Sequence, residues 1–132
     1  MPAVRVLVVD DHGGCRRALE ELVEAAGFEV AAAADSGEAA LAALSELAPD
    51  LVLLDVRMPG MGGRAAATAI AALRPDTVVV LVSETPRGSD DGVVAKSALT
   101  PGLLRGLWRV RAPAGPSHPL PVQVRDRSLG AR

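Results

Sequence analysis

Short runs rich in valine, leucine or alanine alternate along the chain with longer segments in which apolar residues recur at helical spacing. The apolar runs occupy residues 4–9, 28–33, 51–54, 77–82 and 93–95. The helical segments occupy residues 14–26, 36–48, 64–73 and 99–110. Strands that alternate with helices indicate βαβ units, in which a parallel sheet carries helices on both faces. The chain is therefore expected to form one α/β domain.

Composition narrows the class of protein. The 132 residues suffice for a single domain, and the formal net charge of −2 does not favour binding to nucleic acid or to an anionic membrane. Cys15 is the only cysteine, so a reducing compartment is expected. The chain shows neither a secretion signal nor a run of about 20 apolar residues. A cytoplasmic location follows as an expectation.

The last part of the chain differs in composition from the rest. Five proline and glycine residues fall close together there: Pro113, Gly115, Pro116, Pro119 and Pro121. We therefore expect a domain over residues 1–110 and an irregular tail over 111–132. Within that tail, residues 120–124 alternate between apolar and other positions and could add a short edge strand.

Charged and polar residues stand where the predicted strands end. These residues are Asp10, Asp11, Asp55, Ser83 and Lys96. The carboxyl ends of parallel strands lie at one edge of a sheet, so the side chains should converge. Three neighbouring carboxylates repel one another unless a cation sits among them, and oxygen ligands suit Mg²⁺. Removal of either Asp10 or Asp11 is therefore expected to relieve repulsion in the metal-free protein.

A carboxylate beside Mg²⁺ can act as a nucleophile toward a phosphoryl group. A hydroxyl and an ammonium group on neighbouring strand ends can then bind the phosphoryl oxygens. Zinc is not expected, because His12 and Cys15 lack further ligands at the usual spacing. The cluster thus indicates phosphoryl transfer to an aspartate.

These motifs resemble the receiver domain of two-component response regulators. The matching stretches are VVDDH at residues 8–12, DLVLLDVRMPGMGG at 50–63, LVS at 81–83, and Lys96. The resemblance covers residues 4–110 and is closest to receivers of helix-turn-helix regulators. It implies a flavodoxin-like, doubly wound (βα)₅ fold with strand order 2-1-3-4-5.

The resemblance also implies a role for each site residue. Asp55 would be the phosphoacceptor, with Ser83 and Lys96 contacting the phosphoryl group. The metal site would consist of Asp10, Asp11, Asp55 and the backbone carbonyl of Arg57, with Asp11 a direct ligand and Asp10 acting mainly through water. Such a domain is not an enzyme in the usual sense, although it assists its own phosphoryl transfer and hydrolysis. Its partner would be a histidine kinase or a phosphotransfer protein.

The chain departs from the family between Ser83 and Lys96, which lie only 13 positions apart. About eight residues remain for a crossover that normally takes about a dozen or more, so the fourth helix should be shortened or absent. Glu84 replaces a small residue, Val93 an aromatic residue, and Ser97 a proline. The uncovered edge of the sheet would favour a homodimer or another cover, such as residues 120–124.

Two functions remain open from the sequence. The chain is either a receiver that switches on phosphorylation or a degenerate receiver that acts as a phosphorylation-independent interaction module. A phosphatase that forms its own aspartyl phosphate is disfavoured, because Asp55-Val56-Arg57 lacks the second aspartate of that pattern.

Overall fold

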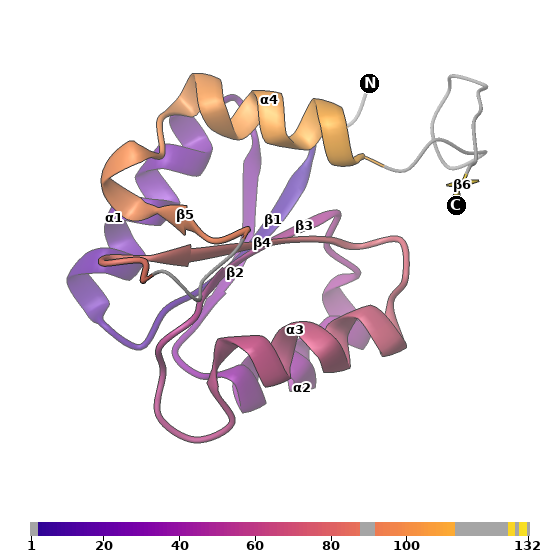
Figure 1. Ribbon diagram of the computed structural model, residues 1–132, viewed down its shortest axis with the longest axis horizontal. Helices are drawn as coiled ribbons and strands as arrows, with labels where there is room; N and C mark the ends of the chain where they lie inside the picture. The colour runs from indigo at the N-terminus through magenta and orange to yellow at the C-terminus, as the bar shows by residue number, and fades with distance from the viewer. Residues whose placement is uncertain (1–2, 88–91, 113–126, 129, 132) are drawn as a thin grey trace.

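A five-stranded parallel sheet forms the centre of the computed structural model (Figure 1). The structure describes residues 3–87, 92–112, 127–128 and 130–131. The strands are β1 (Arg5–Val9), β2 (Glu29–Ala34), β3 (Leu51–Asp55), β4 (Val78–Ser83) and β5 (Val94–Ala95). Their order is β2-β1-β3-β4-β5, so the predicted order and fold class are confirmed.

Helices cover both faces of the sheet. They are α1 (Gly13–Ala25), α2 (Gly37–Leu47), α3 (Gly62–Leu73), the 3₁₀ turn η1 (Lys96–Ala98) and α4 (Pro101–Arg111). Figure 1 shows α1 and α4 on one face and α2 and α3 on the other. The last helix begins at Pro101 rather than at residue 99, because Thr100 caps it and proline suits a first helical position.

The two central strands are buried on both faces, as their continuous apolar sequences predict. Alternate residues of each strand therefore enter different cores. One core lies under α1 and α4 and includes Leu19, Val23 and Leu104. The other lies under α2 and α3 and includes Leu44 and Ile70. Trp108 packs against the first core, as expected for a packing residue.

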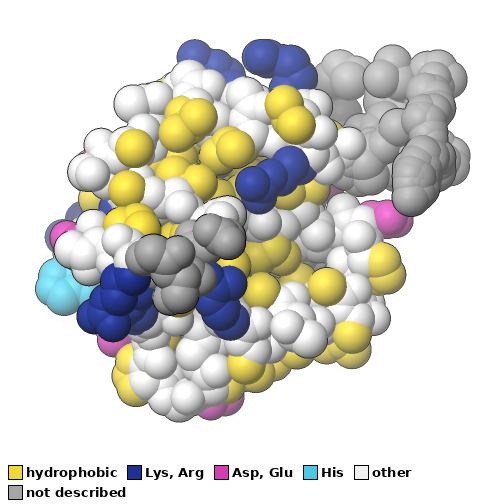
Figure 2. All heavy atoms as spheres, in the orientation of Figure 1, with side chains coloured by type: hydrophobic (Ala, Val, Ile, Leu, Met, Phe, Trp, Pro, Cys, Tyr) yellow, Lys and Arg dark blue, Asp and Glu magenta, His cyan; other side chains and the backbone are white. Residues whose placement is uncertain are grey.

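The connection between β4 and β5 contains no helix in its described residues, 84–87 and 92–93. β5 is correspondingly short and pairs with β4 only through Val82↔Val94 and Ser83↔Ala95. On the α2 and α3 face, Val79 and Leu81 of β4 are only half-buried. Figure 2 shows hydrophobic side chains gathered between α4 and α3, in the region that a further helix would cover. The prediction of a shortened or absent fourth helix is confirmed.

Most of the C-terminal tail lies outside the described residues, and this includes the edge strand expected at 120–124. Two short strands are described there, β6 (Arg127–Ser128) and β7 (Gly130–Ala131), which pair with each other in antiparallel fashion. Among the helices of the described part, none is both long and apolar enough to cross a membrane.

Candidate functional site

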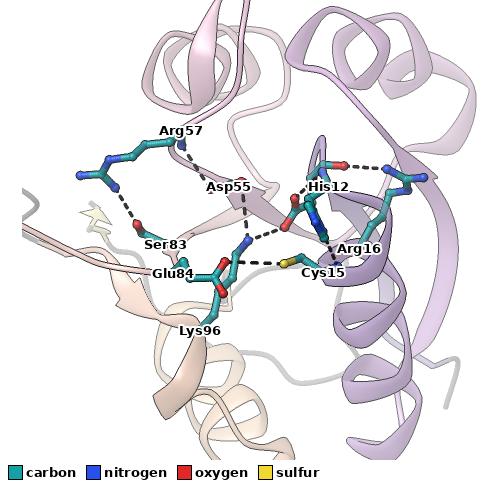
Figure 3. A network of polar contacts seen from close by, with 9 residues as sticks. His12, Cys15, Arg16, Asp55, Arg57, Ser83, Glu84 and Lys96 are labelled. Carbon is teal, nitrogen blue, oxygen red and sulfur yellow. Dashed lines mark hydrogen bonds and ion pairs between the residues drawn. The ribbon is translucent and has the colours of Figure 1, made fainter.

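Four strands deliver side chains to one edge of the sheet, as the sequence predicted. Asp10 follows β1, Asp55 ends β3, Ser83 ends β4, and Lys96 follows β5. Figure 3 shows the Lys96 ammonium directed toward Asp55 beside the first turn of α1, and the Ser83 hydroxyl directed toward the Arg57 side chain. The register places Asp55 opposite Val82, so Ser83 stands one residue further along the neighbouring strand.

A lysine bridges two of the carboxylates. Lys96 Nζ donates to Asp10 Oδ2 at 2.6 Å and lies 3.6 Å from Asp55 Oδ2. Asp10 is fully buried, and its other oxygen, Oδ1, accepts a hydrogen bond from the backbone N–H of His12 at 2.9 Å. Both oxygens of this buried carboxylate are therefore satisfied without a metal ion.

This pairing corrects the expectation that removal of either Asp10 or Asp11 relieves repulsion. Removal of Asp10 would take away the carboxylate nearest to Lys96 and the acceptor of the His12 N–H. Asp11 is exposed, so the expectation still applies to it.

The local environment changes the pKa of two site groups. Burial raises the pKa of Asp55, and Asp10 and Asp11 add to the effect, against the opposing Arg57 N–H and Lys96 charge. For Lys96, burial lowers the pKa, but the hydrogen bond and charge of Asp10 together with the charge of Asp55 outweigh it, so the net pKa is raised. Lys96 therefore stays charged, and the ionised form of Asp55 is less favourable than that of a carboxylate in water.

The carboxylates have the geometry of a possible metal site. One oxygen each from Asp10, Asp11 and Asp55 lies within 4.8 Å of the others. This all-oxygen donor set fits Mg²⁺, which prefers oxygen ligands. The backbone N–H of Arg57 donates to Asp55 Oδ1 at 3.2 Å, which fixes the loop beside the carboxylate. The role of the Arg57 carbonyl as a ligand stays a prediction.

The Arg57 side chain is a feature that sequence reasoning missed. Its Nη1 donates to Ser83 Oγ at 2.6 Å, and Ser83 is buried. The contact joins the loop after β3 to the end of β4 (Figure 3). One signal was available in the sequence: an arginine two residues after Asp55 has the length to reach the neighbouring strand.

Glu84 and Cys15 face each other across the opening of the site. Cys15 Sγ lies 3.7 Å from Glu84 Oε1, and the thiol pKa is raised, chiefly by burial. Both residues line a cavity of about 270 Å³ together with Asp55, Ser83 and Lys96. His12 is exposed, as expected, and its Nδ1 accepts from the Cys15 N–H at 3.3 Å, which caps α1.

A glycine allows the loop after Asp55 to close tightly. The Gly63 N–H donates to the Val56 carbonyl at 2.9 Å. A side chain at Gly63 would collide with the backbone carbonyl oxygen of Asp55. Gly63 thus lets the start of α3 lie directly against the end of β3, and so holds the loop that carries Arg57.

Comparison with known proteins identifies this arrangement. The family model for the response regulator receiver domain matches residues 6–102, which is most of the chain. The chain belongs to the response-regulator receiver family.

Individual relatives agree with this assignment. Response regulator GacA of Pseudomonas viridiflava is 50% identical over 60 residues, which cover 45% of this receiver and 28% of GacA. Chemotaxis protein CheY of Thermotoga maritima is 44% identical over 57 residues, which cover 43% of this receiver and 48% of CheY. The matches thus span less than half the length of either relative.

A solved receiver structure resembles most of this fold. The signal receiver domain of NarL from Mycobacterium tuberculosis superposes with a TM-score of 0.75 at 29% identity. The superposition covers 84% of this receiver and 98% of that chain.

Within this receiver the departures from the family pattern lie on one side of the site. Glu84 stands at the opening, Val93 precedes the short β5, and Ser97 follows Lys96 within η1. Despite the short crossover, Lys96 still reaches Asp10 and Asp55. The departures therefore change the surroundings of the carboxylate cluster and leave the cluster itself assembled.

Proposed function

We propose that this receiver accepts a phosphoryl group on Asp55 from a partner histidine kinase or phosphotransfer protein in the cytoplasm. The observation that carries the proposal is the position of Asp55, buried at the end of β3, with Lys96 3.6 Å away and two further aspartates beside it. A carboxylate in a cavity whose pKa is raised by burial is a candidate for a reacting group.

In this proposal an oxygen of Asp55 attacks the phosphorus atom of a phosphohistidine. A P–O bond forms as the P–N bond breaks, and the bonding electron pair leaves with the imidazole. Mg²⁺ held by Asp10, Asp11, Asp55 and the Arg57 carbonyl would neutralise the charge on the phosphoryl oxygens. Lys96 and Ser83 would hold those oxygens by charge and by hydrogen bonding. Water would later attack phosphorus, release phosphate and restore Asp55.

The second candidate is a degenerate receiver that binds a partner without phosphorylation. Three features of the chain favour it: Glu84 beside the site, Val93 in place of an aromatic residue, and a crossover that forms no helix in its described residues, 84–87 and 92–93. The resemblance places Glu84 beside the path of the phosphoryl group, and the other two features on the surface through which receivers usually signal. In this alternative the carboxylate cluster would take no part in phosphoryl transfer.

Binding of the phosphoryl analogue beryllofluoride in the presence of Mg²⁺ separates the two candidates. The switching receiver should bind the analogue at Asp55, change the environment of Trp108 or of backbone amides near β4, and lose this response in Asp55→Asn. A degenerate receiver should give the same spectra with and without the analogue, at any Mg²⁺ concentration.

A further inference from the structure

In the hydrogen bond between Arg57 and Ser83, the donor and the acceptor can be assigned from the chemistry of the two side chains. A guanidinium group only donates hydrogen bonds, so in the 2.6 Å contact Ser83 Oγ must be the acceptor. A serine hydroxyl has one proton to donate and two lone pairs that accept. The contact with Arg57 occupies a lone pair and leaves the proton of the Ser83 hydroxyl for another acceptor.

The other acceptor would lie inside the site. Ser83 is 1% exposed, so its hydroxyl proton has little access to solvent. Ser83 ends β4, Arg57 lies two residues beyond the end of the adjacent β3, and both line the same cavity as Asp55. A phosphoryl group on Asp55 would bring oxygens that only accept hydrogen bonds into this cavity. The charge of Arg57 would also polarise the Ser83 hydroxyl and make it a stronger donor.

We propose that Arg57 is a positioning residue that turns the Ser83 hydroxyl into a dedicated donor for the phosphoryl oxygens. The inference rests on the proposed function, because it needs a phosphoryl group on Asp55. Val93 offers only methyl groups and cannot orient a hydroxyl by hydrogen bonding. In this chain the loop after β3 would therefore orient the Ser83 hydroxyl at the end of β4.

A double-mutant cycle tests whether Arg57 acts through Ser83. The variants are Arg57→Met, Ser83→Ala and the double variant, with Arg17→Met as a matched control that removes one exposed charge from α1. The rate of labelling by acetyl phosphate with Mg²⁺ is followed by intact mass. Arg57→Met should slow labelling about five- to tenfold when Ser83 is present, and less than about twofold in the Ser83→Ala background.

Three results would overturn the proposal. Arg57→Met could leave labelling at the rate of the Arg17→Met control. It could slow labelling equally in both backgrounds, which would make Arg57 independent of Ser83. Urea unfolding of the unphosphorylated proteins could show coupling between the two residues while labelling shows none, which would make the contact structural only. If the wild-type chain takes no label at all, both the proposed function and this inference fail. If the wild-type chain is labelled but the double-mutant cycle gives one of the three results above, only this inference fails.

Discussion

Lys96 and Asp10, 86 positions apart in the chain, meet at 2.6 Å in the interior of the site. Asp10 is fully buried and the Lys96 side chain is 14% exposed, so the pair is shielded from solvent. Loss of one partner from such a pair leaves an uncompensated charge in a poorly solvated place. The metal-free protein thus uses Lys96 to offset part of the negative charge of the cluster.

This pair predicts unequal effects for the two adjacent aspartates. Asp10→Ala should lower the free energy of unfolding by about 1–3 kcal/mol, less than for a fully buried pair, because Asp55 remains near Lys96. Asp11→Ala should change it by no more than about 0.5 kcal/mol, because Asp11 is exposed. Urea unfolding in the presence of a chelator measures both. A larger loss for Asp11→Ala than for Asp10→Ala would contradict the assignment of the pair.

The raised pKa of Asp55 predicts a stability that depends on pH. A carboxyl whose pKa is higher in the folded than in the unfolded protein stabilises the fold below its unfolded pKa, and this contribution is lost as pH rises through the folded pKa. At pH 7 the ionised Asp55 therefore costs stability. Asp55→Asn should be more stable than wild type at pH 7 without metal, and the gain should shrink as pH falls toward 3.8, the ordinary pKa of the group.

Unfolding curves at several pH values with a chelator, and again with Mg²⁺, measure this difference. Mg²⁺ should raise the stability of the wild type more than that of Asp55→Asn and so reduce the gain. An Asp55→Asn protein that is less stable than wild type at pH 7, or equally favoured at every pH, would mean that burial does not disfavour the ionised carboxylate.

Glu84 should slow the approach of an anionic phosphodonor, because its carboxylate lines the cavity of Asp55. Glu84→Gln keeps the size of the side chain and removes its charge, whereas Glu84→Ala removes both. Glu84→Gln should speed labelling by acetyl phosphate about two- to fivefold, an effect expected of one exposed charge, and added salt should diminish the gain. An unchanged rate in both variants would exclude Glu84 as a barrier.

The uncovered face beside β4 should promote self-association. Val79 and Leu81 are half-buried apolar residues on the α2 and α3 face, next to a crossover whose described residues form no helix. Larger apolar patches usually mark interfaces. Light scattering at micromolar concentration should show a dimer, and Val79→Thr should weaken it. A form that ends after Ala112 tests residues 120–124 as an alternative cover. If both forms are monomers and bind no more of an apolar dye when truncated, the face is closed in another way.

The fold was predictable because its signals are local. Continuous apolar runs such as 51–54 identify buried strands, and Gly63 with its neighbours identifies the loop after Asp55. The meeting of Asp10, Asp55, Ser83 and Lys96 follows from the rule that parallel strands end at one edge.

Contacts between long side chains were not predictable in the same way. The Arg57–Ser83 hydrogen bond depends on which way a flexible side chain turns after β3. The Cys15–Glu84 contact depends on the distance between α1 and the end of β4. Likewise, the closer approach of Lys96 to Asp10 at 2.6 Å than to Asp55 at 3.6 Å is a difference of about an ångström in the packed structure. None of these distances follows from a pattern of residue types.

The most direct test of the account is the intact mass of the full chain after incubation with acetyl phosphate and Mg²⁺, beside Asp55→Asn treated in the same way. We expect the wild type to gain the mass of one phosphoryl group, to lose it slowly on removal of the donor, and to gain none when Mg²⁺ is chelated. We expect Asp55→Asn to gain none under any condition. Equal labelling of the two proteins would contradict the assignment of Asp55, and no labelling of a folded wild type would contradict the proposed function.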